Sequence, residues 1–137
     1  MKSIKEIELR YSDSDQMGVV YHANYFSFFE QGRTHMLQEL GIDYYQIEQK
    51  GFIFPVRDVN CTYLKSIRLG ERIFVETTLQ KITKVRFDFS HVIYNQNQEI
   101  KAKGNTSIIS VSRETFDIVK MDQVLPEVYQ IKDKIRE

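Results

Sequence analysis

The segment from Tyr11 to Arg33, which reads YSDSDQMGVVYHANYFSFFEQGR, places acids, an imidazole and several aromatic rings close together. Asp15 is the carboxylate in it that can do chemistry. It can attack an activated acyl carbon and form an anhydride, or it can take a proton from water. Both reactions need a polarised carbonyl nearby. A carboxylate in a turn before a helix can equally serve the structure, by capping backbone N–H groups.

The start of a helix would supply the donors that polarise such a carbonyl. Its first N–H groups lack intrahelical partners, and its dipole favours negative charge. If the helix begins near residues 21–24, the backbone N–H of His22 is a candidate oxyanion donor, and the His22 ring can bind substrate or orient Asp15. His22 and Asn24 can also be helix-cap residues only. Gly18 lets the backbone turn or approach a ligand closely.

A second cluster is basic and consists of Lys81, Lys84 and Arg86. Charges at a strand junction either protect a solvated sheet edge from aggregation or clamp the phosphates of an anionic cofactor tail. His35 fits a polar position on a helix, and His91 fits a packed or surface position on a strand. The sequence has no HxH, HExxH or CxxC spacing, so we expect no metal site. It also lacks GxGxxG, GxxxxGK[ST] and GxSxG.

Composition narrows the class of protein. The 137 residues are most simply one domain, 1–137, and 19 basic residues balance 19 acidic ones, which argues against a sequence-independent nucleic-acid binder. Cys61 is the single cysteine, which fits a reducing compartment, and we expect it to be a buried apolar filler in a strand. We find no secretory signal and no stretch near the ~20 apolar residues of a membrane span. We therefore expect a cytoplasmic protein.

A long helix and a sheet must position these residues. Apolar or small residues recur at helical spacing between about residues 22 and 40, Gly41 ends the pattern, and Asp43 suits the cap of a short helix that ends near Gly51. We expect Pro126 to open a last amphipathic helix. The residues of the long helix that we expect to be buried are Tyr25, Phe26, Phe28, Phe29, Gly32, Met36, Leu37 and Leu40.

Strands are predicted over residues 4–10, 54–64, 71–82, 87–95 and 99–112, which are rich in β-branched and aromatic residues. One long apolar helix followed by successive strands predicts an α+β fold, with an antiparallel sheet wrapped around the helix. Some strands carry bulky residues on both faces, as with Phe74 beside Ile73 and Val92 opposite Phe89. We therefore expect a second buried surface and a homo-oligomer.

The segment YSDSDQMGVVYHANYFSFFEQGRTHML resembles the signature of hotdog-fold acyl-CoA thioesterases of the 4-hydroxybenzoyl-CoA thioesterase family. Within that family it is most similar to the branch associated with the bacterial Tol–Pal envelope system. The segment GFIFPVRDVNCTYLKSIRLGE resembles the family's second-strand region, and the resemblance extends from about Ile4 to Val119. The matching positions of the signature are Tyr11, Asp15, Gly18, Val19, Val20, Tyr21, His22, Asn24, Tyr25, Glu30 and Arg33.

The resemblance implies a hotdog fold, in which a five-stranded antiparallel sheet curls around the long helix, in protomers that form dimers or tetramers. It implies hydrolysis of an acyl-CoA thioester with no metal and no cofactor, since coenzyme A is part of the substrate. The catalytic positions fall on Asp15, His22 and Tyr11. Those expected to bind substrate are Gly18, Val20, Tyr21 and Asn24, with Lys84 and Arg86 at the CoA phosphates.

Two alternatives remain open at the level of sequence. One is a thioesterase that acts on acyl groups carried by acyl carrier protein. The other is a non-catalytic acyl-CoA-binding protein that keeps the fold. Asp15 separates the second alternative from the enzymes, because a binding protein has no need of a carboxylate at that position.

Overall fold

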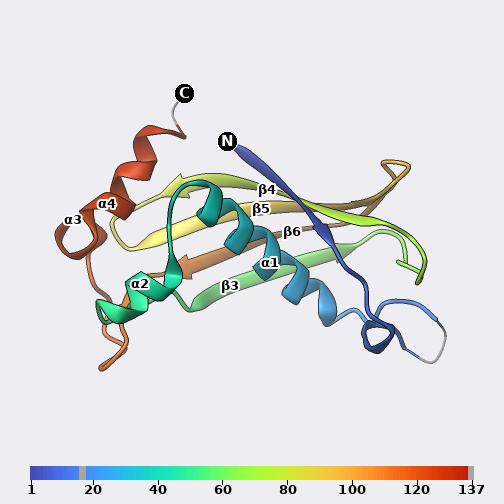
Figure 1. Ribbon diagram of the computed structural model, residues 1–137, viewed down its shortest axis with the longest axis horizontal. Helices are drawn as coiled ribbons and strands as arrows, with labels where there is room; N and C mark the ends of the chain where they lie inside the picture. Colours follow the sequence, from blue (N-terminus) through green and yellow to red (C-terminus); the bar gives the residue numbers. More distant parts are fainter. Residues whose placement is uncertain (16–17, 136–137) are drawn as a thin grey trace.

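Five antiparallel strands form one sheet with a long helix across its inner face (Figure 1). The computed structural model describes residues 1–15 and 18–135. The strand order is β1-β4-β5-β6-β3, and every neighbouring pair is antiparallel. The predicted α+β architecture is therefore confirmed. The strands of this sheet are β1 Lys2–Ile7, β3 Val56–Tyr63, β4 Ile73–Ile82, β5 Arg86–Asn95 and β6 Ile100–Ile109.

The longest helix is α1, and the other elements outside the main sheet are short. A two-stranded sheet pairs β2 with β7, and the C-terminal helices lie at the end of the main sheet where β4 turns into β5 (Figure 1). No helix in the described part of the chain is long and apolar enough to cross a membrane. The bounds are α1 Asn24–Glu39, α2 Tyr44–Gln49, β2 Phe52–Ile53, β7 Val111–Ser112, α3 Met121–Val124, α4 Pro126–Tyr129, and the 3₁₀ turns η1 Tyr11–Asp13 and η2 Gln130–Asp133.

Helix α1 buries one broad face against the sheet, as its apolar spacing predicts. Gly41 ends the helix region with a φ of +85°, and the Asp43 carboxylate caps α2 by accepting the Tyr45 N–H at 2.9 Å. The prediction that Phe26 is buried is wrong, because its side chain is 42% exposed. Phe26 lies about 100° around the helix from Tyr25 and so at the margin of the buried face. The buried residues of α1 are Tyr25, Phe28, Phe29, Gly32, Arg33, Met36 and Leu37.

The helix packs against the sheet at His91. The Phe29 ring stacks on the imidazole at 4.6 Å, and the imidazole bonds the hydroxyls of Thr77 at 3.0 Å and Thr106 at 2.8 Å. Gly104 makes this approach possible, since a Cβ added there would lie 2.5 Å from the Phe29 ring. The sequence left His91 as a packed or a surface residue, and the structure shows that it is packed, with 1% of it exposed.

Two predicted elements and one predicted burial differ in detail from the structure. The first strand spans Lys2–Ile7 rather than residues 4–10. It ends early because the Arg10 N–H donates to the Asp13 carboxylate at 2.8 Å and so belongs to the following turn. The last helix is interrupted, with α4 followed by the 3₁₀ turn η2. Cys61 is half-buried rather than buried, because it lies on the edge strand β3.

Candidate active site

The turn before the helix is organised by Asp13. This residue is 4% exposed, and its carboxylate accepts bonds from the backbone N–H and the guanidinium of Arg10. Its carbonyl accepts the N–H of Tyr21 at 2.8 Å and the side-chain amide of Asn24 at 2.9 Å. Asp13 is thus used by the turn itself, and Asn24 is bound to that turn rather than to the pocket described below.

Asp15 lies in a tight loop on the far side of that turn. Its N–H donates to the carbonyl of Val19 at 2.8 Å, and its carbonyl accepts the Gly18 N–H at 3.1 Å. One carboxylate oxygen accepts the Val19 N–H at 3.4 Å, a long contact. Gly18 has a φ of +79°, and a Cβ there would meet nothing within 4 Å. The glycine is therefore required by the backbone conformation of the loop and not by a crowded neighbour.

The start of α1 presents donors that the helix itself does not use. The Asn24 N–H donates to the carbonyl of Tyr21, and the Tyr25 N–H donates to the carbonyl of His22. Among the described residues, no acceptor bonds the N–H of His22 or of Ala23. These two groups lie at the positive end of a 16-residue helix, where negative charge is favoured.

Asp15 and His22 line the same pocket, which has a volume of about 300 Å³. The structure thus brings together three of the predicted site residues, Asp15, Val20 and His22. Val20 is 5% exposed and joins the hydrophobic core behind the pocket. Among the described residues, the lining is Asp15, Val19, Val20, His22, Tyr25, Tyr63, Leu64, Lys65 and Ser66.

One wall of the pocket was missed by the sequence analysis. It is formed by residues 63–66, which end β3 and begin the loop after it. The Tyr63 hydroxyl donates to the carbonyl of His22 at 2.9 Å, and the Tyr63 ring packs edge-on against Tyr25 at 4.9 Å. Burial raises the pKa of Tyr25 to about 12, so this phenol stays protonated. No local pattern marks this wall, since only strand pairing brings it to the helix.

Two predicted aromatic residues lie outside this pocket within the chain. Tyr11 is 87% exposed on η1 and is not among the lining residues. Tyr21 is 49% exposed, with its ring 4.5 Å from the His22 ring. Both side chains are thus exposed, and Tyr21 contacts the lining residue His22.

Lys84 and Arg86 lie at the opposite end of the sheet from Asp15. They belong to the hairpin between β4 and β5, beside the C-terminal helices, whereas α1 begins at the other end (Figure 1). The Lys84 ammonium is 3.7 Å from the Asp122 carboxylate, and the Arg86 guanidinium is 3.1 Å from the Asp88 carboxylate. Within one chain, neither residue can contact a ligand that sits only in the pocket.

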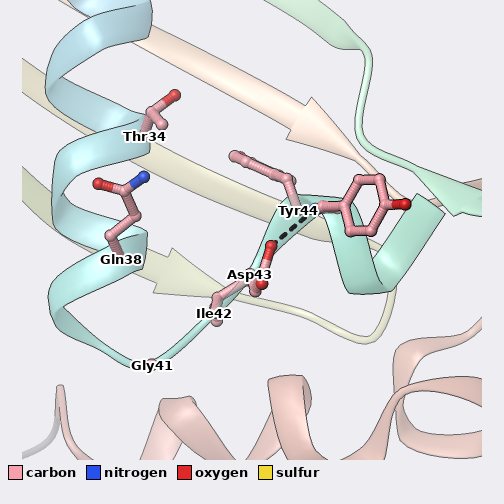
Figure 2. A pocket seen from close by; sticks show the side chains of 7 residues that line it. Thr34, Gln38, Gly41, Ile42, Asp43 and Tyr44 are labelled. Carbon is pink, nitrogen blue, oxygen red and sulfur yellow. Dashed lines mark hydrogen bonds between the residues drawn. The ribbon is translucent and has the colours of Figure 1, made fainter. Parts of the chain in front are cut away.

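A second hollow of about 490 Å³ lies between α1 and α2 (Figure 2). Thr34 and Gln38 face it from α1, and Gly41, Ile42, Asp43 and Tyr44 face it from the other side. Its one carboxylate, Asp43, is already used as the cap of α2. The helix that begins at this hollow has only six residues, and its cap is the acid itself, so we do not assign the chemistry to it. In the described part of the chain, no group of three or more His, Cys, Asp or Glu residues could hold a metal ion.

The comparisons with known proteins assign the chain to the hotdog-fold thioester hydrolases. The chain belongs to the Thioesterase-like superfamily, whose family model matches residues 9–129. The putative acyl-CoA thioesterase YneP of Bacillus subtilis is 37% identical over 134 residues, covering 98% of this chain and 97% of that protein. The acyl-CoA thioester hydrolase YbgC of Escherichia coli is 26% identical over 105 residues, covering 77% of this chain and 78% of that protein.

A solved structure gives the same result. The DHNA-CoA thioesterase from Staphylococcus aureus is 36% identical and superposes with a TM-score of 0.95, covering 98% of this chain and 91% of that chain. These similarities confirm the predicted hotdog fold and the predicted class of enzyme, a thioester hydrolase.

Proposed function

We propose that this protein hydrolyses an acyl-CoA thioester to the free acid and coenzyme A, with Asp15 as the reacting carboxylate. The observation that carries the proposal is that Asp15 and His22 line one pocket at the start of α1. The thioester carbonyl would lie between the carboxylate and the N–H of His22. The adjacent N–H of Ala23 is a second donor for the same oxygen.

Two routes are consistent with this geometry. Asp15 can attack the carbonyl carbon, so that the C–S bond breaks, the CoA thiolate leaves and a water molecule then hydrolyses the anhydride. Alternatively, Asp15 takes a proton from water while the water oxygen attacks the carbon, and the C–S bond then breaks, which releases the CoA thiolate and the free acid. In both routes the carbonyl oxygen gains negative charge, which the helix N–H groups stabilise. A thiolate is a good leaving group, so neither route needs a strong general acid.

The lining of the pocket supports an aromatic acyl group as the substrate to test first. Three aromatic rings line the pocket, and the Tyr63 ring meets the other two edge-on, with its centroid 6.0 Å from that of His22 and 4.9 Å from that of Tyr25. The Staphylococcus aureus relative is named as a DHNA-CoA thioesterase. We therefore propose an aroyl-CoA of the 1,4-dihydroxy-2-naphthoyl type as substrate.

We also propose that a second copy of the chain covers β3. This strand is the last of the sheet, and its Val56, Val59 and Tyr63 side chains are 42–47% exposed. An edge strand with exposed apolar side chains usually needs cover, and β3 exposes three of them beside the charged Arg57 and Asp58. The other edge, β1, exposes one large apolar side chain, Ile4 at 52%, beside Lys2 and Glu6. A further contact over the outer face, where Phe74 and Tyr94 stack at 5.6 Å, would turn a dimer into a tetramer.

Such a partner would also be needed for the predicted role of Lys84 and Arg86. Within one chain, Lys84 and Arg86 lie at the opposite end of the sheet from Asp15. They can therefore bind the CoA phosphates only if the hairpin of a second copy lies beside this pocket. Sedimentation of the wild type and of Val59→Lys tests the pairing. An oligomer for the wild type and a monomer for the variant are expected, whereas a monomeric wild type contradicts it.

Several finer expectations stay predictions. One is membership of the Tol–Pal-associated branch, which the run of matching residues from Tyr11 to Arg33 supports. The others are a cytoplasmic location, a single domain over residues 1–137 and activity without a cofactor.

The proposed activity is tested by following free thiol release from a panel of aroyl-CoA and aliphatic acyl-CoA esters, with the same acyl groups on acyl carrier protein in parallel. Turnover of the CoA esters supports the proposal, and faster turnover of aroyl esters supports the substrate class. Turnover only on the carrier protein favours the acyl carrier protein alternative. Binding of CoA esters without any thiol release favours the non-catalytic alternative and contradicts the proposal.

A further inference from the structure

Lys101 is a buried lysine behind the pocket that the proposed chemistry does not use. It lies near the start of β6 and is 5% exposed. Its ammonium donates to the carbonyl of Ser66 at 3.0 Å and to the carboxylates of Glu71 and Glu99, each at 2.9 Å. A buried ammonium is costly unless it is paired and hydrogen-bonded, and this one has three acceptors.

The charges around Lys101 balance. Glu99 also accepts from Lys65 at 2.9 Å, and Glu71 accepts from the Asn95 amide at 3.0 Å. Burial alone would lower the pKa of Lys101, but its bonds to Glu99 and Glu71 outweigh burial and raise it. The lysine therefore stays charged at neutral pH, and the network persists there.

The backbone of Lys101 also binds the loop of residues 64–72. Its carbonyl accepts the N–H of Leu64 at 2.9 Å and the N–H of Lys65 at 3.1 Å. Residues 64–72, all of them described, form no helix or strand of their own. Lys101 thus binds residues 64 to 66 at the start of this loop and Glu71 near its end.

This loop in turn supports the catalytic segment. The Val20 N–H donates to the carbonyl of Ile67 at 2.7 Å, and Val19 forms an isolated bridge with Arg68. Lys65 and Ser66 line the pocket directly. The chain of contacts therefore runs from the Lys101 ammonium through residues 64–68 to the backbone that carries Asp15 and His22.

We propose that Lys101 is a positioning residue for thioester hydrolysis, which holds residues 64–68 so that Val20 and the start of α1 stay in place. This inference rests on the proposed function, but the measurement of hydrogen exchange at Val20 described below does not depend on it. Without the ammonium, the Ile67 carbonyl moves more freely, and the Val20 N–H loses its fixed acceptor. Misplaced helix donors lower transition-state stabilisation, so kcat falls more than KM changes.

The test measures amide hydrogen exchange at Val20 together with kcat and KM, in Lys101→Met. A Lys103→Met variant is the matched control, because Lys103 is exposed one position beyond Ala102 on the same strand. For Lys101→Met we expect at least tenfold faster exchange at Val20 and at least a tenfold lower kcat, with KM within about threefold. For Lys103→Met we expect no change. Unchanged Val20 exchange in Lys101→Met overturns the proposal, whether or not Asp15 is the catalytic group.

Charge balance is separated from positioning by the double variant Lys101→Met with Glu71→Gln. It removes the cation and one of its carboxylates together, so its melting temperature should recover towards the wild type while kcat stays low. Recovery of both would mean that Lys101 only neutralises charge, and would overturn the proposal. If Lys101→Met does not fold, Glu71→Gln tests the same ion pair, because a glutamine can still accept the Arg68 N–H that Glu71 accepts at 2.7 Å but carries no charge for Lys101. A smaller loss of Val20 protection and of kcat is then expected, and wild-type values would contradict the proposal.

Discussion

The Tyr63 hydroxyl donates a 2.9 Å hydrogen bond to the carbonyl of His22, so the edge strand β3 holds the turn from which α1 begins. The two residues are far apart in sequence and meet because β3 pairs with β6 beneath the helix. The position of the proposed oxyanion donor therefore depends on the sheet as well as on the helix.

Tyr63→Phe removes that bond and keeps the ring. A hydrogen bond of this kind contributes about 0.5–1.5 kcal/mol, so we expect kcat to fall by about 2- to 10-fold with a small change in KM. Tyr45→Phe is the control, because Tyr45 is 69% exposed on α2 and away from the pocket. An equal effect of both substitutions on kcat would speak against a role for the Tyr63 bond.

His22→Ala separates the ring of His22 from its backbone. The backbone N–H, which we propose as the oxyanion donor, is kept, whereas the ring and its contact with Tyr63 are lost. We expect kcat to fall by no more than about tenfold, well short of the loss from removing an oxyanion donor, about 100-fold or more. If His22→Ala lowered kcat as much as Asp15→Asn does, the chemistry would instead be assigned to the imidazole.

His91 should make the protein less stable in acid. Burial, with a smaller contribution from the nearby Arg33 charge, lowers the pKa of the imidazole from 6.5 to about 3. The unfolded chain then binds a proton that the folded chain does not, so stability is full above pH 6.5 and falls by about 1.4 kcal/mol per pH unit down to about pH 3.

Urea unfolding between pH 7 and pH 4 measures this slope. His91→Gln lacks the titrating group and should show a shallower decline over the same range, although its stability at pH 7 is lower. Parallel slopes for the two proteins would show that other groups account for the acid sensitivity.

Gly104→Ala should destabilise the fold where α1 meets the sheet. The added Cβ would lie 2.5 Å from the Phe29 ring and would also collide with the carbonyl of Asn60. Overpacking of this kind costs about 1–3 kcal/mol in the free energy of unfolding. Lys103→Ala, at an exposed position of the same strand, should change it by less than about 0.5 kcal/mol. Similar urea midpoints for the two variants would be inconsistent with this packing.

Much of the fold was predictable because its patterns are local. The spacing of apolar residues located α1, and the β-rich segments 71–82 and 87–95 located the strands β4 and β5. The same local pattern drew attention to Asp15 and His22, which lie close in sequence and share one pocket.

The pocket wall at residues 63–66 and the role of Lys101 could not be predicted in this way. Both depend on the register of β3 with β6, in which Tyr63 pairs with Ala102, and no local pattern encodes that register. The misplacement of Phe26 has a different cause. Helical periodicity indicates the direction of the buried face, but its width depends on how far the sheet wraps around the helix.

Asp15→Asn compared with Asp13→Asn is the most direct test of the account, with thiol release from the best acyl-CoA substrate as the measurement. Asp13 is bound by the turn and Asp15 lines the pocket, so the two carboxylates have different roles. We predict that Asp15→Asn lowers kcat by at least about 100-fold while the protein stays folded, and that Asp13→Asn acts mainly on stability. Wild-type kcat in a folded Asp15→Asn protein would contradict the proposed mechanism.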